Sequence, residues 1–99
     1  MKEKEQPMRE TEARKRWVEV FSALASEPRL RIVEMLIGRT VDCQEILDEL
    51  SLSQPAVSYH LGRLERAGVL VKERNGARNC YHLNEDLTGL IELLKEEVR

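Results

Sequence analysis

The sequence is poor in cysteine and has no long hydrophobic run, and these two absences exclude several classes of protein. Among its 99 residues are only two cysteines, Cys43 and Cys80, too few for the disulfide framework of a small secreted domain. No apolar run approaches the roughly 20 residues that a membrane-spanning helix needs. Residues 1–7 carry charges and no apolar stretch, so they do not resemble a secretory signal. We therefore expect a cytoplasmic protein with no membrane partner.

The patterns that accompany enzymatic sites are also missing. The chain has no glycine-rich phosphate loop, no paired carboxylates in an apolar setting, and no Cys–His or Ser–His pairing that can be placed in space. Internal repeats and long linkers are absent as well. We expect one non-enzymatic domain over residues 13–99. Residues 1–12 form a charged N-terminal extension, which either lengthens the first helix or frays.

Charge of one sign does not dominate the chain, whose formal net charge is −2, but charge is segregated along it. Residues 54–83 carry five Lys or Arg against two Asp or Glu, whereas residues 17–53 and 84–99 are both acidic. A phosphate backbone responds to the local field rather than to the net charge. The basic segment is therefore a candidate nucleic-acid surface, although an ordinary solvated surface has a similar composition.

Apolar residues recur at helical spacing in five segments. The five sets are Trp17, Val20, Phe21 and Leu24; Leu30, Val33, Leu36 and Ile37; Ile46, Leu47 and Leu50; Val57, Leu61 and Leu64; and Leu87, Leu90, Ile91, Leu94 and Val98. Ser26, Asp42 and Ser53 stand at N-cap positions of the second, third and fourth helices. Glu45 completes a capping box with Asp42. Only residues 51–52 separate the third helix from the fourth, so a sharp turn must join them.

A β-hairpin pattern follows over residues 69–83. Two strand-like segments, residues 69–71 and 80–83, flank Asn75-Gly76, and Asn-Gly is the strongest short-range hairpin signal. With these two residues as the turn, Glu73 lies opposite Arg78. Cys80 then lies opposite Val71 and is expected to be a small buried side chain.

A short helix, a tight turn and a second capped helix form a helix-turn-helix, and the hairpin after it forms a wing. The predicted fold is mainly α with a small β-hairpin. A recognition helix over about residues 53–67 that buries its apolar side turns its polar side outward, toward the major groove. The residues we expect to contact DNA are Gln54, Ser58, Tyr59 and Arg63 on this helix, and Arg74 and Arg78 on the wing. For Arg78, a cross-strand pair with Glu73 competes with the DNA contact.

Two blocks of this sequence, in this order, resemble the ArsR/SmtB family of bacterial and archaeal repressors. They are residues 21–32 (FSALASEPRLRI) and residues 52–61 (LSQPAVSYHL). The resemblance continues over about residues 17–98 and implies a winged-helix homodimer, formed through its first and last helices, that binds operator DNA until a small signal releases it. Gln54, Ser58 and Tyr59 match DNA-contact positions of the family. His60 matches a position usually filled by His or Gln, and we expect it to be a packed or capping residue.

The resemblance breaks at the family's metal sites. The thiolate positions of its third-helix motif fall on Asp42, Gln44 and Leu47, and residues 84–99 contain no His or Cys for the site on the last helix. We therefore expect no metal and no other cofactor. Cys43 and Cys80 remain candidates for redox sensing, and ordinary buried thiols are the competing interpretation.

The leading hypothesis is a homodimeric, sequence-specific regulator of double-stranded DNA, most simply a repressor. The alternative is a winged-helix module for protein–protein assembly that uses its acidic surfaces and does not bind specific DNA. Basic residues on both the recognition helix and the wing favour the first hypothesis, because an assembly module does not need them.

Overall fold

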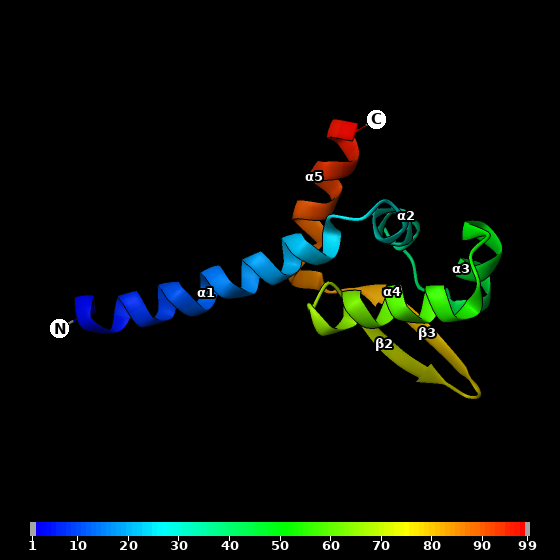
Figure 1. Cartoon of the computed structure of the whole chain (residues 1–99), viewed down its shortest axis with the longest axis horizontal. Coiled ribbons are helices and arrows are strands. Elements are labelled where there is room, and N and C mark those ends of the chain that lie inside the picture. The colour runs from blue at the N-terminus through cyan, green and yellow to red at the C-terminus, as the bar shows by residue number, and fades with distance from the viewer. Residues whose placement is uncertain (1, 99) are drawn as a thin grey trace.

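The computed structural model describes the backbone of residues 2–98 and the side chains of residues 10–93 and 96. Its elements are α1 (Lys2–Leu24), α2 (Glu27–Met35), β1 (Val41–Asp42), α3 (Cys43–Leu50), α4 (Gln54–Arg66), β2 (Leu70–Asn75), β3 (Arg78–Leu83), the 3₁₀ turn η1 (Glu85–Leu87) and α5 (Thr88–Val98) (Figure 1). This order confirms the predicted winged helix-turn-helix. Helix α1 begins at Lys2, so it runs through the segment that the sequence set apart as a charged extension.

The predicted N-caps are all present. The Ser26 side chain accepts from the backbone N–H of Arg29, and Ser53 Oγ accepts from Ala56 N at 3.2 Å. Asp42 Oδ1 accepts from Glu45 N at 2.9 Å, while Glu45 Oε1 accepts from Asp42 N at 3.5 Å, so the capping box is complete. Each cap satisfies an N–H that the first turn of a helix cannot pair internally, which fixes where α2, α3 and α4 begin.

The turn between α3 and α4 depends on Ser51. Its φ is 56°, in the left-handed region that usually takes glycine, and its N–H donates to Leu47 O at 3.3 Å. The chain leaves α3 at this residue and re-enters helix at the Ser53 cap. The sharp turn that the short spacing predicted is thus made by one residue in a strained backbone conformation.

The wing has a different register from the one predicted. Its turn residues are Gly76 and Ala77, with Asn75 opposite Arg78, rather than Asn75 and Gly76. The predicted pair of Glu73 with Arg78 is therefore wrong: Glu73 lies opposite Cys80. The positive φ at the turn, 67°, falls on the first central residue alone, as in a type II′ turn, so Asn75 can stay in the strand.

The predicted pair of Val71 with Cys80 is also wrong, because Val71 lies opposite His82. The sheet has one strand more than the sequence predicted. Strand β1 pairs antiparallel with β3, so the order is β1-β3-β2. Two residues are too few to show the alternation that marks a strand, and β1 is held by its partners rather than by its own pattern. It attaches the wing directly to the start of α3.

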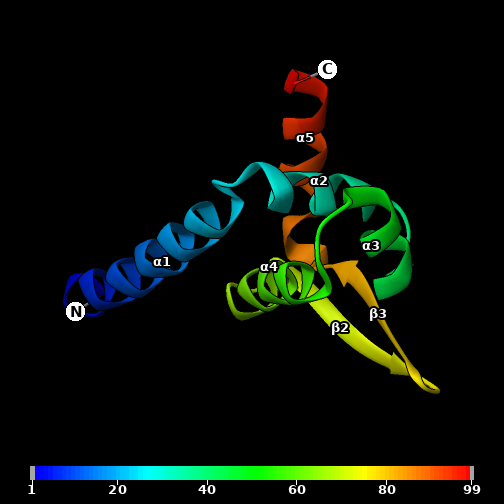
Figure 2. The ribbon, with the colours of Figure 1, turned by 45° about the vertical axis from the view of Figure 1, so that its right-hand side comes forward.

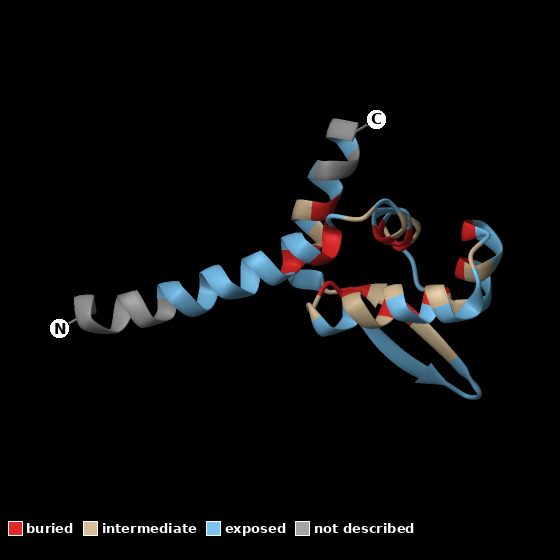
Figure 3. Ribbon diagram, in the orientation of Figure 1, coloured by how far each residue is buried: buried red, intermediate tan, exposed pale blue. Residues whose placement is uncertain are grey.

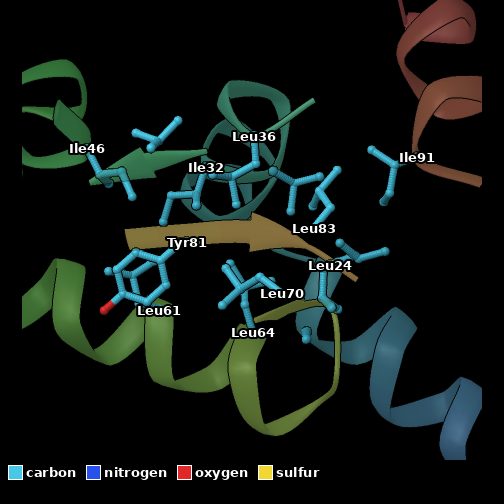
Figure 4. Close-up of a cluster of buried hydrophobic side chains, with 14 of the residues drawn as sticks. Leu24, Ile32, Leu36, Ile46, Leu61, Leu64, Leu70, Tyr81, Leu83 and Ile91 are labelled. Carbon is cyan, nitrogen blue, oxygen red and sulfur yellow. The ribbon is translucent and has the colours of Figure 1, made fainter. Parts of the chain in front are cut away.

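One hydrophobic core joins the helices to the sheet (Figure 4). In this view Leu61 and Leu64 of α4 lie on one side of β3 and Ile32 and Leu36 of α2 on the other. The predicted positions Leu94 and Val98 lie outside the described side chains. Most of the other predicted apolar positions are buried in the core, while Ile37, Leu47 and Leu90 are half-buried and three are exposed. Trp17 and Phe21 are 43% and 52% exposed, and Leu30 is 38% exposed.

Among the described residues of α1, 10–24, those that are buried in the core lie in its C-terminal part: Val20, Ala23 and Leu24 (Figure 3). In α2 the buried side includes Arg29 and Ile32 as well as Val33. The predicted set that began at Leu30 is therefore rotated by about one residue, because a pattern of apolar residues does not include a buried arginine. Within the described residues, no helix combines the length and apolar character needed to cross a bilayer.

Glycine substitutions at two serines test the turn. Ser51→Gly removes the steric cost of the left-handed conformation and is expected to raise the free energy of unfolding by about 0.5–1 kcal/mol. Ser53→Gly, two residues on, removes a cap at a φ of −67° and is expected to lower it by a few tenths of a kcal/mol. Urea unfolding followed by circular dichroism measures both, and a loss of stability in Ser51→Gly would contradict this description of the turn.

Candidate nucleic-acid interface

Helix α4 has one buried and one exposed side, as predicted. Val57, Leu61 and Leu64 are buried, whereas Gln54, Ser58 and Tyr59 are exposed, the last by 57%. The apolar side fixes the helix on the core, so the outward side chains are held on a rigid support. Gln54 and Ser58 lie in the first turns of the helix, the end that reaches base edges in helix-turn-helix proteins.

The wing and α4 lie on the same side of the molecule. Both ribbon views show the β2–β3 hairpin projecting beside α4, away from the C-terminal end of α5 (Figures 1 and 2). Residues 71–78, which include the tip of the wing, are exposed. Gln54 and the wing residues 77–79 line one groove of about 540 Å³, together with residues from the start of α3. The start of α4 and the tip of the wing therefore border the same groove, whose remaining wall is the start of α3.

The two wing arginines are held differently. Arg74 is exposed, and its Nε donates to Gly76 O at 3.1 Å, which keeps the guanidinium at the turn. Arg78 Nη1 donates to Asp42 Oδ2 at 3.1 Å, and its side chain is 76% exposed. The competing partner of Arg78 is thus Asp42, not Glu73. Glu73 instead pairs with His82, whose Nε2 lies 3.1 Å from Glu73 Oε2.

Arg63 is turned toward α1 rather than toward the wing. It is half-buried, and its Nη2 donates to Ser22 Oγ at 3.3 Å. Beside it on α4, a Cβ added to Gly62 would meet only the flexible end of Arg66, with Nη1 at 3.1 Å. Within the described residues no other element restricts position 62, so a partner that displaces the Arg66 side chain can approach the backbone there.

Both cysteines are free and half-buried. The pKa of the Cys43 thiol is raised above 9.0, first by burial and then by the neighbouring Asp42 carboxylate. A sensing thiol needs a lowered pKa, because the thiolate is the reactive form. The surroundings of Cys43 therefore oppose the redox role that the sequence left open. Among the residues that the structure describes, no group of three or more His, Cys, Asp or Glu side chains is placed to hold a metal ion.

A buried arginine beneath this surface was not predicted from the sequence. Arg29 of α2 is buried, and its Nη1 lies 3.1 Å from Nδ1 of His60 on α4. His60 was expected to be a packed or capping residue, and it is half-buried beside the core. In the sequence Arg29 lies between apolar positions just as Arg31 does, and no feature of the helical pattern distinguishes the two.

Comparison with known proteins identifies the same substructure. Residues 24–73 match the model of a helix-turn-helix domain family. An uncharacterized HTH-type transcriptional regulator of Methanocaldococcus jannaschii is 34% identical over 80 residues, covering 79% of this chain and 90% of that protein. The arsenical resistance operon repressor of Bacillus subtilis is 35% identical over 83 residues, covering 82% of this chain and 79% of that protein. The structure of HlyU from Vibrio cholerae superimposes with a TM-score of 0.80 at 32% identity, covering 85% of this chain and 92% of that one.

The raised pKa of Cys43 can be measured by alkylation. In a Cys80→Ser background, the rate of reaction with iodoacetamide should rise with pH around a midpoint above that of a free thiol. Asp42→Asn should lower the midpoint, because it removes one of the two causes of the raised pKa, the Asp42 charge. Asparagine can still cap α3. A midpoint near neutral pH would contradict this assignment and restore Cys43 as a sensing thiol.

Proposed function

Because this chain belongs to the ArsR/SmtB family of winged helix-turn-helix transcriptional regulators, we propose that it is a sequence-specific repressor that binds double-stranded DNA as a homodimer. The family consists of DNA-binding regulators rather than enzymes. The observation that carries the proposal is the joint surface of α4 and the wing. It combines an exposed polar helix face with an exposed basic hairpin, and the buried side of α4 holds it rigidly.

In the proposed complex α4 enters the major groove. Gln54, Ser58 and Tyr59 then face base edges, because they lie on the outward side of the helix near its N-terminal end. The wing lies over the phosphate backbone or in the adjacent minor groove, where the guanidinium of Arg74 meets phosphates. A cytoplasmic location follows from the role, since bacterial and archaeal operators lie in that compartment.

Two further arginines contact DNA only by exchanging partners. Arg78 exchanges the Asp42 carboxylate for a phosphate, and Arg63 exchanges the Ser22 hydroxyl. Both present interactions involve exposed or half-buried groups, which contribute only about 0–1 kcal/mol each. A phosphate in the groove therefore competes easily with them, and the cost of the exchange is small.

The homodimer is proposed to form through α1 and α5. Trp17, Val18 and Phe21 of α1 are 43%, 60% and 52% exposed, and Leu93 of α5 is 56% exposed. The Trp17 and Phe21 rings stack with centroids 5.7 Å apart, so they form one apolar patch. A patch of large apolar side chains on a protein surface is typical of an interface with another protein.

Repression is the simplest outcome of such binding, since a dimer bound across a promoter excludes polymerase. The Bacillus subtilis relative is named a repressor, whereas HlyU of Vibrio cholerae is named an activator. A reporter gene downstream of the bound site distinguishes the two, because deletion of a repressor raises expression and deletion of an activator lowers it. No metal is proposed as the inducer.

DNA binding is tested by fluorescence anisotropy with a duplex from upstream of the protein's own gene, at several salt concentrations and against scrambled competitor. Gln54→Ala is expected to cost about 1–3 kcal/mol on the specific site and little on scrambled DNA. Arg74→Ala should weaken binding to both and reduce the salt slope by about one. Arg31→Ala on α2 is the matched control, because Arg31 is exposed but outside the surface. If scrambled DNA displaces the wild-type protein as well as the specific site does, the assembly-module alternative is favoured.

The dimer is tested by sedimentation velocity on charge variants of the apolar patch. Phe21→Glu is expected to shift the protein from dimer to monomer, because it places a carboxylate against a second copy of α1 and α5. The control is Val71→Glu, which changes an apolar wing residue of similar exposure, 40%, and should remain dimeric. A dimeric Phe21→Glu with an unchanged circular dichroism spectrum would show that the interface lies elsewhere.

A further inference from the structure

Arg29 is the charged residue that the described part of the structure buries, with 8% of its surface exposed. A buried guanidinium is costly unless its N–H groups are paired. No ion pair with a carboxylate is found for it within that part. Its partners are instead a backbone carbonyl of α1 and a side chain of α4, so this one residue of α2 touches the helices on both sides.

The first contact completes the C-terminal end of α1. Arg29 Nε donates to Ala23 O at 2.6 Å. Ala23 is the second-last residue of α1, and the last four carbonyls of a helix have no partner within it. The last turn of α1 has no basic residue of its own. Arg29 therefore supplies from the next helix the cation that the negative end of the α1 dipole favours.

The second contact reaches the recognition helix. Arg29 Nη1 lies 3.1 Å from Nδ1 of His60. Arginine can only donate, so Nδ1 must accept, which requires that its lone pair be free and that the ring proton sit on Nε2. His60 adjoins Tyr59, and their rings meet edge to face with centroids 5.4 Å apart. The contact thus ends beside one of the side chains proposed to face bases.

We propose that Arg29 is a positioning residue for operator recognition, which holds α4 at a fixed angle to α1 through the Ala23 carbonyl and a neutral His60. The inference rests on the proposed function. If α1 forms the dimer, then the position of α4 relative to α1 sets the separation of the two recognition helices. That separation must match the half-site spacing of the operator. The Arg29–His60 contact therefore affects which half-site spacing is bound, and not which bases are preferred.

Only arginine has the shape for this task. Its planar fork sends N–H groups in different directions, so one side chain can bond α1 and α4 at once, whereas lysine is a single point donor on a flexible stem. The hold on α4 also depends on the neutral form of His60. A protonated ring has no acceptor and carries a charge of the same sign as Arg29.

The surroundings of His60 keep it neutral. Its pKa is lowered from 6.5, first by burial and then by the Arg29 charge. The groups that face it are Arg29 from α2 and Tyr59 from α4, while Arg63, one turn further along α4, is turned to Ser22 of α1. From α1, Glu19 lines a concavity with Arg63 near the end of α4. The contact is therefore intact at neutral pH and is lost as pH falls below 6.5 through the lowered pKa.

Paired substitutions at position 60 test the proposal in the full-length protein. His60→Gln keeps an acceptor and should bind the specific duplex within about twofold of wild type, whereas His60→Leu removes the acceptor and should bind about five- to tenfold more weakly. Both should bind scrambled DNA as wild type does. Duplexes with one base pair added between the half-sites provide the sharper readout, because His60→Leu should discriminate against them less than wild type and His60→Gln.

A pH series separates positioning from general loss of stability. The ratio of wild-type to His60→Gln affinity should be constant above pH 7 and should fall as pH is lowered below 6.5, because only wild type loses its acceptor. His82, the other histidine, is present in both proteins, so any effect it has on binding is common to both and leaves the ratio unchanged.

The two failures are distinguishable. If wild type shows no preference for specific DNA, the proposed function fails. If wild type shows the preference, and folded His60→Leu keeps both its affinity and its spacing discrimination, the function stands and this role of Arg29 is overturned. Arg29→Met is a second check, since it matches the side-chain volume without charge: wild-type spacing discrimination in that variant also refutes the role.

Discussion

The packing of one side of α4 into the core is the constraint on which the rest of the structure depends. Val57, Leu61 and Leu64 are buried in the core, where α4 contacts α1, α2 and β2, and their burial decides which residues of α4 remain outside. A recognition surface made of polar side chains has no cohesion of its own. It obtains its rigidity from the apolar side of the same helix, which contributes about 1.5–3 kcal/mol for each large side chain buried.

Buried polar contacts set the orientation of α4 more finely than apolar packing can. Leucine and valine side chains tolerate small rotations of a helix, since dispersion contacts are numerous and non-directional. The hydrogen bonds from Arg29 to Ala23 and His60 are directional and span three helices. The core therefore fixes which side of α4 faces outward, and the proposed role of Arg29 is to fix the angle of α4 to α1.

Much of this arrangement could be predicted from the sequence, because strong local signals agree with the tertiary structure. Caps at Ser26, Asp42 and Ser53 and the apolar side of α4 are local features, and each was predicted correctly. The failures concern residues whose environment is set by distant parts of the chain. Burial of Arg29 needs a carbonyl of α1 and a ring of α4, and the partner of Arg78 comes from β1. The wing register is a local exception, since it depends on which residue of the Asn75-Gly76-Ala77 segment takes the positive φ first.

The ion pair of Arg78 with Asp42 reduces the positive charge that the wing presents to any nucleic acid. Asp42 is an internal counterion: it is fixed in place by its capping role in α3, and it partly neutralises the wing before any DNA arrives. A bare arginine on the tip would attract every polyanion in the cell equally. In the proposed complex, a phosphate has to replace the Asp42 carboxylate before Arg78 contributes to binding, so a site that positions a phosphate there gains more from the wing than random sequence does.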